Sequence, residues 1–245
     1  MSRPVLLIAG GSRGIGAATA KLAGARGYDV AVNYKTNSNA AASVVNAVVK
    51  AGGKAVAIQG DMALENDIER VFNAATDALG SLTHFVHSSG IIGDNSRLDD
   101  ASAQIIREVL DVDTFGALLC LRACMRRMST KHGGKGGAVV MLSSMAAPLG
   151  GANECVWYAA AKAGVDSMVI GASREVAKEG MRINAVTPGV IDTDIQPPGR
   201  IERVTPMLPM GRAGLSDEVA EAVLFLLSDA ASYINGANLR VSGAR

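Results

Sequence analysis

Short apolar runs alternate with helical patterns along the chain of 245 residues, and this alternation restricts the fold more than any other feature. The run PVLLIAG (4–10) is apolar without a break, which is typical of a strand that is covered on both faces. Similar runs recur after Ala-rich or amphipathic stretches, and no linker interrupts the series. This order predicts an α/β fold with one doubly wound parallel sheet, helices on both faces, and ligand at the carboxyl ends of the strands.

The pattern locates each expected element in turn. Strands are expected over residues 4–10, 28–34, 54–61, 82–90, 138–144, 182–189 and 237–243. Helices are expected over residues 15–27, 38–51, 65–80, 101–128, 156–179 and 216–228, the last opened by Ser216 with Glu218 in its first turn. All of them fit one domain, 1–245, which includes a substrate segment at about 194–214.

The charge balance excludes several classes of partner. Lys plus Arg is 24 and Asp plus Glu is 23, for a net charge of +1, so no basic field recruits nucleic acid or an anionic membrane. No apolar run approaches the length of a membrane span, and the run after Met1 is too short for a secretory signal. We therefore expect a cytoplasmic protein.

Cysteine and histidine usage points to neither disulfides nor a metal. The three cysteines are an odd number, and Cys120 and Cys124 lie one helical turn apart beside leucines, as small buried side chains do. His84 and His87 share one expected strand, where their odd separation sends them to opposite faces. No bound metal is expected.

A glycine-rich turn, AGGSRGIG (9–16), joins the first expected strand to the first expected helix. Glycines allow close approach of a pyrophosphate, and the helix N-terminus offers unpaired N–H groups. The spacing differs from G-x-G-x-x-G, so a purely structural turn is the alternative. The candidate phosphate-binding residues are Gly10, Ser12, Arg13, Gly14, Ile15 and Gly16.

The end of the second strand discriminates between the two nicotinamide cofactors. An acidic residue there would bind a ribose 2′-hydroxyl and repel a 2′-phosphate. The sequence VNYKTNS has Asn33 and Lys35 instead of a carboxylate, and Arg13 adds a nearby cation. This corner favours NADP(H) over NAD(H). The alternative is that both cations are solvated surface residues.

The segment YAAAK (158–162) places Tyr158 and Lys162 on one helix face, four residues apart. A tyrosine has a pKa of about 10, and a nearby ammonium group stabilises the phenolate and lowers that value. Ser144, in LSS (142–144), ends a strand and could hold a substrate carbonyl oxygen. Taken alone, such a Tyr–Lys pair is more often a surface pair.

The ordered motifs AGGSRGIG, GDM (60–62), HSSG (87–90), LSS, YAAAK and NAVTPGVIDT (184–193) together resemble the short-chain dehydrogenase/reductase family over essentially the whole chain. The resemblance implies a seven-stranded Rossmann sheet, an NAD(P)(H) cofactor, and usually a homotetramer. It also implies hydride transfer between the nicotinamide and a carbonyl or alcohol carbon.

The resemblance also implies roles for individual residues. Tyr158 is the acid/base, Lys162 lowers its pKa and binds the nicotinamide ribose, and Ser144 polarises the substrate carbonyl. Asp61 contacts adenine, Gly90 allows close approach of the cofactor, and Thr193 contacts the carboxamide. The remaining implied cofactor positions are Met62, Ser88, Pro188, Gly189 and Ile191, with Tyr158 and Lys162.

The chain departs from the family pattern in two segments. His87, Ser88 and Ser89 replace the usual Asn-Asn-Ala before Gly90. Asp113 stands in VLDVDTFG (109–116), where the family has the Asn whose backbone carbonyl holds a water beside the active-site lysine. We expect Asp113 either to alter this proton path or to be a structural carboxylate buried at a subunit interface.

The leading functional prediction is an NADP(H)-dependent reductase of a 3-oxoacyl group or another ketone. A sugar or polyol dehydrogenase of the same family and a non-catalytic NADP(H)-binding sensor or assembly protein are the alternatives. The partner is then a small carbonyl or alcohol substrate, and an acyl chain on a carrier protein is a further candidate. Arg126, Arg127 and Lys131 could meet an acidic carrier, although an ordinary solvated helix end is the favoured explanation of these residues.

Overall fold

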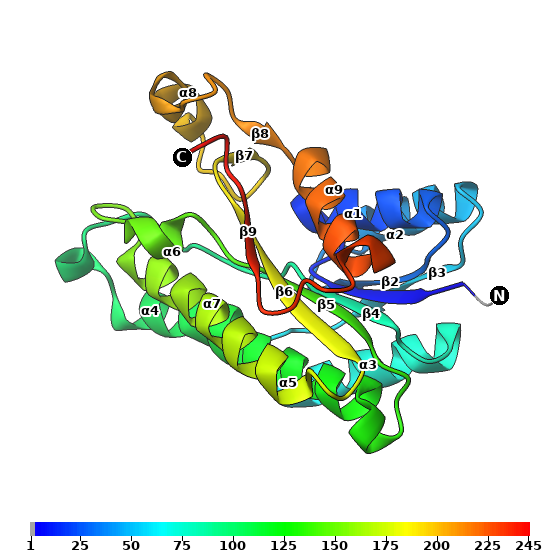
Figure 1. Ribbon diagram of the computed structural model, residues 1–245. Helices are drawn as coiled ribbons and strands as arrows, with labels where there is room; N and C mark the ends of the chain where they lie inside the picture. Colours follow the sequence, from blue (N-terminus) through cyan, green and yellow to red (C-terminus); the bar gives the residue numbers. More distant parts are fainter. Residues whose placement is uncertain (1–2) are drawn as a thin grey trace.

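The computed structural model, which describes residues 3–245, is built on a seven-stranded sheet in the order β3-β2-β1-β4-β5-β6-β9 (Figure 1). Every pairing in this sheet is parallel, which confirms the predicted doubly wound α/β architecture. The strands are β1 (Val5–Ala9), β2 (Asp29–Tyr34), β3 (Ala55–Gln59), β4 (His84–His87), β5 (Gly137–Leu142), β6 (Met181–Pro188) and β9 (Asn238–Val241).

Helices cover both faces of the sheet, and each face has its own apolar core (Figure 1). On one face lie α1 (Gly14–Ala25), α2 (Ser38–Lys50) and α9 (Ser216–Leu227). On the other lie α3 (Glu65–Leu79), α4 (Ala103–Leu110), α5 (Ala117–Met128) and α7 (Val156–Val176). Leu6 and Ile8 of β1 belong to the first core, while Val5 and Leu7 belong to the second, because alternate side chains of a strand point to opposite faces.

The helix expected over residues 101–128 is present from Ala103 to Met128, but it contains an irregular turn that the sequence did not predict. A 3₁₀ turn (Leu98–Asp100) precedes α4, whose first turn is capped by the Ser102 hydroxyl accepting from the Ile105 N–H at 3.2 Å. A π-helical turn, Asp111–Gly116, then separates α4 from α5. Such wide turns occur frequently at functional sites. Gly116 packs so closely that a Cβ there would lie 2.0 Å from the Met62 carbonyl oxygen.

The start of α9 also differs from the expectation. The helix begins at Ser216, so Leu215 occupies the N-cap position where a capping serine was expected. No side chain at that position caps the helix. The Glu218 carboxylate accepts from the Leu215 N–H at 2.8 Å and pairs with Arg212 at 2.6 Å. Glu218, in the first turn, therefore caps the helix. The sequence pattern had predicted that Ser216 would take part in the cap as well.

The substrate segment at 194–214 has some regular structure of its own. It contains α8 (Arg200–Val204) and a 3₁₀ turn (Thr205–Met207), and it projects beyond the carboxyl end of the sheet (Figure 1). The short strands β7 (Ile191–Asp192) and β8 (Gly214–Leu215) pair in parallel and fix its two ends. The other short elements are α6 (Ala146–Leu149), Thr130–His132 and Asp229–Ala231.

The cysteines behave as the sequence predicted. Cys120, Cys124 and Cys155 are free and buried, and the first two belong to the core on the α5 face. Over residues 3–245, no helix combines the length and the hydropathy that crossing a membrane requires.

Candidate active site

Two adjoining cavities follow the carboxyl ends of the strands. The first has a volume of about 540 Å³ and the second about 170 Å³. Residues from the glycine turn, from the end of β4 and from the segment after β7 line both cavities: Ile15, Ser88, Gly90, Ile92, Thr193 and Ile195. The two cavities are therefore parts of one cleft, at the edge where a parallel sheet of this kind binds ligands.

The glycine turn forms the floor of the first cavity. Gly10 has φ +71°, and a Cβ there would lie 2.8 Å from the backbone nitrogen of Ser89. A Cβ at Gly16 would lie 2.2 Å from the Gly10 carbonyl oxygen, so Gly16 permits tight packing of α1 under the turn and does not line the cavity. No side chain caps the first turn of α1, which leaves its N–H groups for an anion.

Asn33 is buried beneath this turn, with an exposed fraction of 1%. Its Oδ1 accepts from the Gly10 N–H at 3.1 Å, and its Nδ2 donates to the Gly60 carbonyl at 3.0 Å. Asn33 lines the cavity, but its amide is used to join the glycine turn to the end of β3. The Asn33 amide is therefore not free to bind a cofactor, and the positively charged groups at this corner are those of Arg13 and Lys35.

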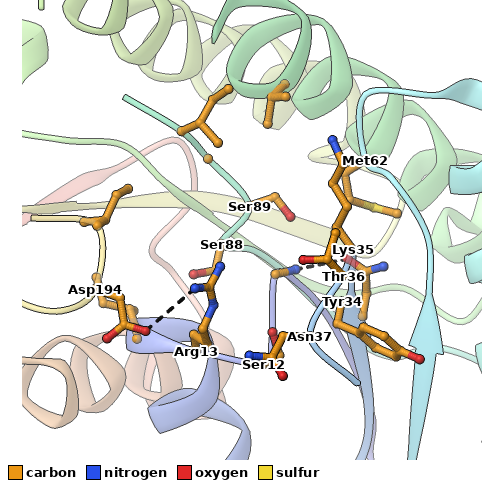
Figure 2. A pocket seen from close by; sticks show the side chains of 18 of the residues that line it. Ser12, Arg13, Tyr34, Lys35, Thr36, Asn37, Met62, Ser88, Ser89 and Asp194 are labelled. Atoms are coloured by element: carbon orange, nitrogen blue, oxygen red, sulfur yellow. Dashed lines mark hydrogen bonds and ion pairs between the residues drawn. The ribbon is translucent and has the colours of Figure 1, made fainter. Parts of the chain in front are cut away.

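Two cations stand at the rim of the first cavity, each beside a carboxylate (Figure 2). Lys35 Nζ lies 2.7 Å from Asp61 Oδ2, and Arg13 Nη1 lies 3.8 Å from Asp194 Oδ2. Both cationic side chains are more than half exposed. A glycine cradle, an uncapped helix end and two rim cations fit a dinucleotide with an extra phosphate.

The second cavity contains Ser144, Tyr158 and Lys162. Tyr158 and Lys162 lie near the start of α7, and Lys162 Nζ is 5.6 Å from the centre of the Tyr158 ring. Nζ also donates to the Leu142 carbonyl at 3.1 Å, which fixes the ammonium group at the end of β5. Burial raises the pKa of Tyr158 above its ordinary value, while the charge of Lys162 and the hydroxyl of Ser144 oppose this rise.

Asp113 lies inside the π-helical turn with no exposed surface, in contact with the same lysine. Its Oδ2 is 3.2 Å from Lys162 Nζ, and its Oδ1 accepts from the Ile91 N–H at 2.8 Å. A Cβ at Gly90 would lie 3.0 Å from Oδ2 and 3.2 Å from Nζ, so glycine makes room for the pair. Burial alone would lower the pKa of Lys162, but the Asp113 carboxylate raises it above its usual value.

His87 is a second buried titratable group near the lysine. Its exposed fraction is 1%, and its Nε2 has no hydrogen-bond partner in the described part of the chain. Burial, assisted by the charge of Lys162, lowers the pKa of His87 to about 3, so the imidazole is neutral. The departure from the family's asparagine at this position thus places an uncharged ring in the core.

Most of the predicted site residues meet in the cleft. The first cavity is lined by Gly10, Ser12, Arg13, Gly14, Ile15, Asn33, Lys35, Asp61, Met62, Ser88, Gly90 and Thr193. The second is lined by Ser88, Gly90, Ser144, Tyr158, Lys162, Pro188, Gly189, Ile191 and Thr193. Gly16 and Asp113 line neither cavity. Gly16 packs against the glycine turn, and Asp113 pairs with Lys162.

Sequence reasoning missed several lining residues. Those in the first cavity include Tyr34, Thr36, Asn37, Ser89 and Asp194, and those in the second include Glu154, Arg200 and Arg245. Three of them, at 34, 36 and 37, flank Lys35 at the end of the second strand. Their position beside Lys35 could have indicated that they line the same cavity. Arg200 and Glu154 pair across 46 residues of chain, which no local pattern indicates.

Comparisons with known proteins agree with this geometry. A family model described as "Enoyl-(Acyl carrier protein) reductase" matches residues 9–243. The chain is 42% identical over 245 residues to the uncharacterized oxidoreductase YgfF of Escherichia coli (strain K12), covering 98% of this chain and 99% of that protein. It is 34% identical to a 3-oxoacyl-[acyl-carrier-protein] reductase of Synechocystis, covering 99% of this chain and 97% of the relative.

A solved structure extends the agreement to three dimensions. A short-chain dehydrogenase from Burkholderia cenocepacia J2315 in complex with NADP superposes with a TM-score of 0.91 at 31% identity, covering 99% of this chain and 97% of that one. The family match spans nearly all of the elements that build the cleft. The chain therefore belongs to the short-chain dehydrogenase/reductase family of oxidoreductases.

Proposed function

We propose that this oxidoreductase reduces a ketone or aldehyde with NADPH, or runs the reverse oxidation of the alcohol. The observation that carries the proposal is the grouping of Ser144, Tyr158 and Lys162 on the wall of a cavity that opens into the glycine-lined one. A carbonyl in the second cavity then lies beside hydroxyl groups, while a dinucleotide in the first reaches it through the shared wall.

In this proposal Tyr158 gives its phenolic proton to the carbonyl oxygen during reduction, and takes it back during oxidation. Ser144 donates a hydrogen bond to the same oxygen and polarises the C=O bond. Lys162 holds a positive charge beside Tyr158, which stabilises the phenolate that remains after proton transfer. Asp113 acts through Lys162, since it contacts the ammonium group and not the cavity.

When bound, the dinucleotide supplies a hydride, with its two electrons, to the carbonyl carbon. The C=O double bond becomes a single bond as the oxygen receives the proton of Tyr158, so the product is an alcohol and the dinucleotide is left oxidised. The phenolate then recovers a proton from solvent, which balances the reaction for the next turnover.

The preference for NADP(H) rests on Arg13 and Lys35, the two rim cations of the first cavity. No carboxylate follows β2, where an acidic side chain would favour NAD(H). Asp61 lies 2.7 Å from Lys35 and Asp194 lies 3.8 Å from Arg13, so a 2′-phosphate would share each cation with a carboxylate, and the longer pair leaves Arg13 the more available. The NADP named in the Burkholderia cenocepacia complex supports the same choice.

We further propose that the chain, 1–245, acts as one domain within a cytoplasmic homotetramer. Exposed apolar side chains of the π-helical turn, α5 and α7 support assembly: Phe115 is 51% exposed, Leu118 46% and Ile170 45%. An acidic carrier protein is less well supported as a partner, because Arg127 is paired with Glu69 at 2.7 Å. Light scattering of the purified protein measures the subunit number directly.

Tyr158→Phe tests the proposed reaction. The variant lacks the transferable proton, so turnover of every carbonyl substrate should fall by about 10³-fold or more, while NADPH binding changes by less than about threefold. NADPH oxidation with a panel of ketones, diketones and aldehydes measures the first effect, and fluorescence titration measures the second. NADPH binding without turnover of any panel member by the parent protein would instead support a sensor.

A further inference from the structure

The mouth of the second cavity carries more positive than negative side-chain charge. Glu154 is the only carboxylate side chain among the described residues that line this cavity, and Arg200 and Arg245 line it as well. Glu154 Oε2 lies 2.7 Å from Arg200 Nη2, and Glu154 Oε1 lies 3.3 Å from Arg203 Nη2. Two guanidinium groups thus contact the Glu154 carboxylate, and a third, that of Arg245, lines the same cavity.

The positive charges of these arginines favour the ionised form of Glu154. Burial would raise the pKa of Glu154, but the hydrogen bond and charge of Arg200, with the charges of Arg203 and Arg245, lower it below its usual value. Glu154 therefore stays ionised and neutralises one guanidinium. An excess of positive charge remains at the cavity mouth for a second anion.

Arg200 is the best-oriented of the three groups. Its side chain is only 14% exposed, and its Nη1 donates to Gln196 Oε1 at 2.8 Å while Nη2 donates to Glu154 Oε2 at 2.7 Å. A guanidinium has five N–H donors, so further donors remain for a ligand. Arg203 differs because it is 61% exposed and does not line the cavity.

We propose that the substrate carries a carboxylate as well as the reacting carbonyl, and that Arg200 and Arg245 bind this carboxylate. The substrate class is then an oxo acid, or the corresponding hydroxy acid in the oxidative direction. The inference rests on the proposed function and narrows it, because a neutral sugar or simple ketone offers these arginines nothing to bind. The planar guanidinium fork suits a carboxylate, and partial burial strengthens the contact.

Matched pairs of substrates test this proposal. The probes are 3-oxobutanoate, 4-oxopentanoate and 5-oxohexanoate, each beside its methyl ester, so that the ketone is retained while the charge is removed. We expect kcat/KM of the parent to favour the acid of at least one pair by about tenfold or more, the worth of one charged hydrogen bond. Added salt should reduce that preference.

Three variants locate the effect. Arg200→Gln should lower kcat/KM for the acid by about tenfold and leave the ester within about twofold, and Arg245→Gln should act in the same direction. Arg203→Gln is the matched control, because it also loses a contact to Glu154 but removes no cavity-lining charge. Equal losses for acid and ester in Arg200→Gln, or no acid preference in any pair, would overturn the proposal.

Melting of the NADPH complex separates this inference from the reaction itself. Acids that raise the melting temperature more than their esters, and lose this advantage in Arg200→Gln, support the anion site even if no probe is reduced. In that case the proposed reaction fails and the inference stands. Reduction of the esters without any acid preference would mean that the proposed reaction stands and that the arginines bind no substrate carboxylate.

Discussion

The Asp113 carboxylate lies 3.2 Å from the Lys162 ammonium group, and the two side chains are 0% and 5% exposed. A buried charge is stable only when it is paired and hydrogen-bonded. Here the Ile91 N–H and the Leu142 carbonyl supply the further contacts of the two partners. Asp113, which stands where the family has an asparagine, is therefore the partner of the lysine beside Tyr158.

This pair predicts a shift in the pH dependence of activity. The negative charge of Asp113 raises the pKa of Tyr158 and so opposes the effect of Lys162. Asp113→Asn removes that charge and also removes the carboxylate that favours the Lys162 cation. The pKa of Tyr158 should therefore fall over the pH range in which Lys162 remains protonated. The alkaline decline of kcat/KM in reduction and its alkaline rise in oxidation should both move to lower pH, by about one unit. Rate profiles in both directions measure the shift.

Asp111→Asn is the control for this experiment. Asp111 lies in the same π-helical turn but is partly exposed, and no ion pair joins it to a described residue. Its removal should leave both profiles in place. Profiles of Asp113→Asn that superimpose on those of the parent would show that the carboxylate has only a structural role.

A second prediction concerns the choice of cofactor. If Arg13 and Lys35 bind the 2′-phosphate, replacing both with glutamine should weaken NADPH binding by about tenfold or more and NADH binding by less than about threefold. Titration of each cofactor measures the two dissociation constants. Lys50→Gln, at the exposed end of α2 and away from the cavity, is the control. Equal weakening of both cofactors would contradict the assignment.

The parts of this molecule that depend on local pattern were predictable from sequence. Continuous apolar runs such as 4–10 marked buried parallel strands, because burial on both faces removes the polar alternation. The glycine turn and the Tyr158–Lys162 spacing were also local, since they depend on a tight backbone turn and on one turn of helix. These signals were enough to locate the cleft.

The features that were missed depend on contacts between distant segments. The π-helical turn, DVDTFG, holds weak helix formers, but these do not by themselves indicate a π turn, and its widening goes with packing of Gly116 on the Met62 carbonyl. Asn33 has the sequence position of a ligand-binding side chain, but the Gly10 N–H and the Gly60 carbonyl occupy its amide in the folded chain. The pairing of Arg200 with Glu154 likewise follows only from the folded arrangement.

The last prediction uses the buried histidine of β4. The pKa of His87 falls from 6.5 to about 3 in the folded chain, chiefly because of burial. A depressed pKa contributes stability that is fully present above pH 6.5 and is lost as the pH falls toward about 3, because the unfolded chain takes up a proton first. His87→Asn has no such proton to bind. Between pH 7 and about pH 4.5 the parent should therefore lose about 2–3 kcal/mol more unfolding free energy than this variant.

Denaturant titrations at the two pH values measure the difference in unfolding free energy. His132→Asn, which changes an exposed histidine, is the control and should follow the parent. Equal acid sensitivity of His87→Asn and the parent would mean that the imidazole is protonated, or solvated, in the folded protein.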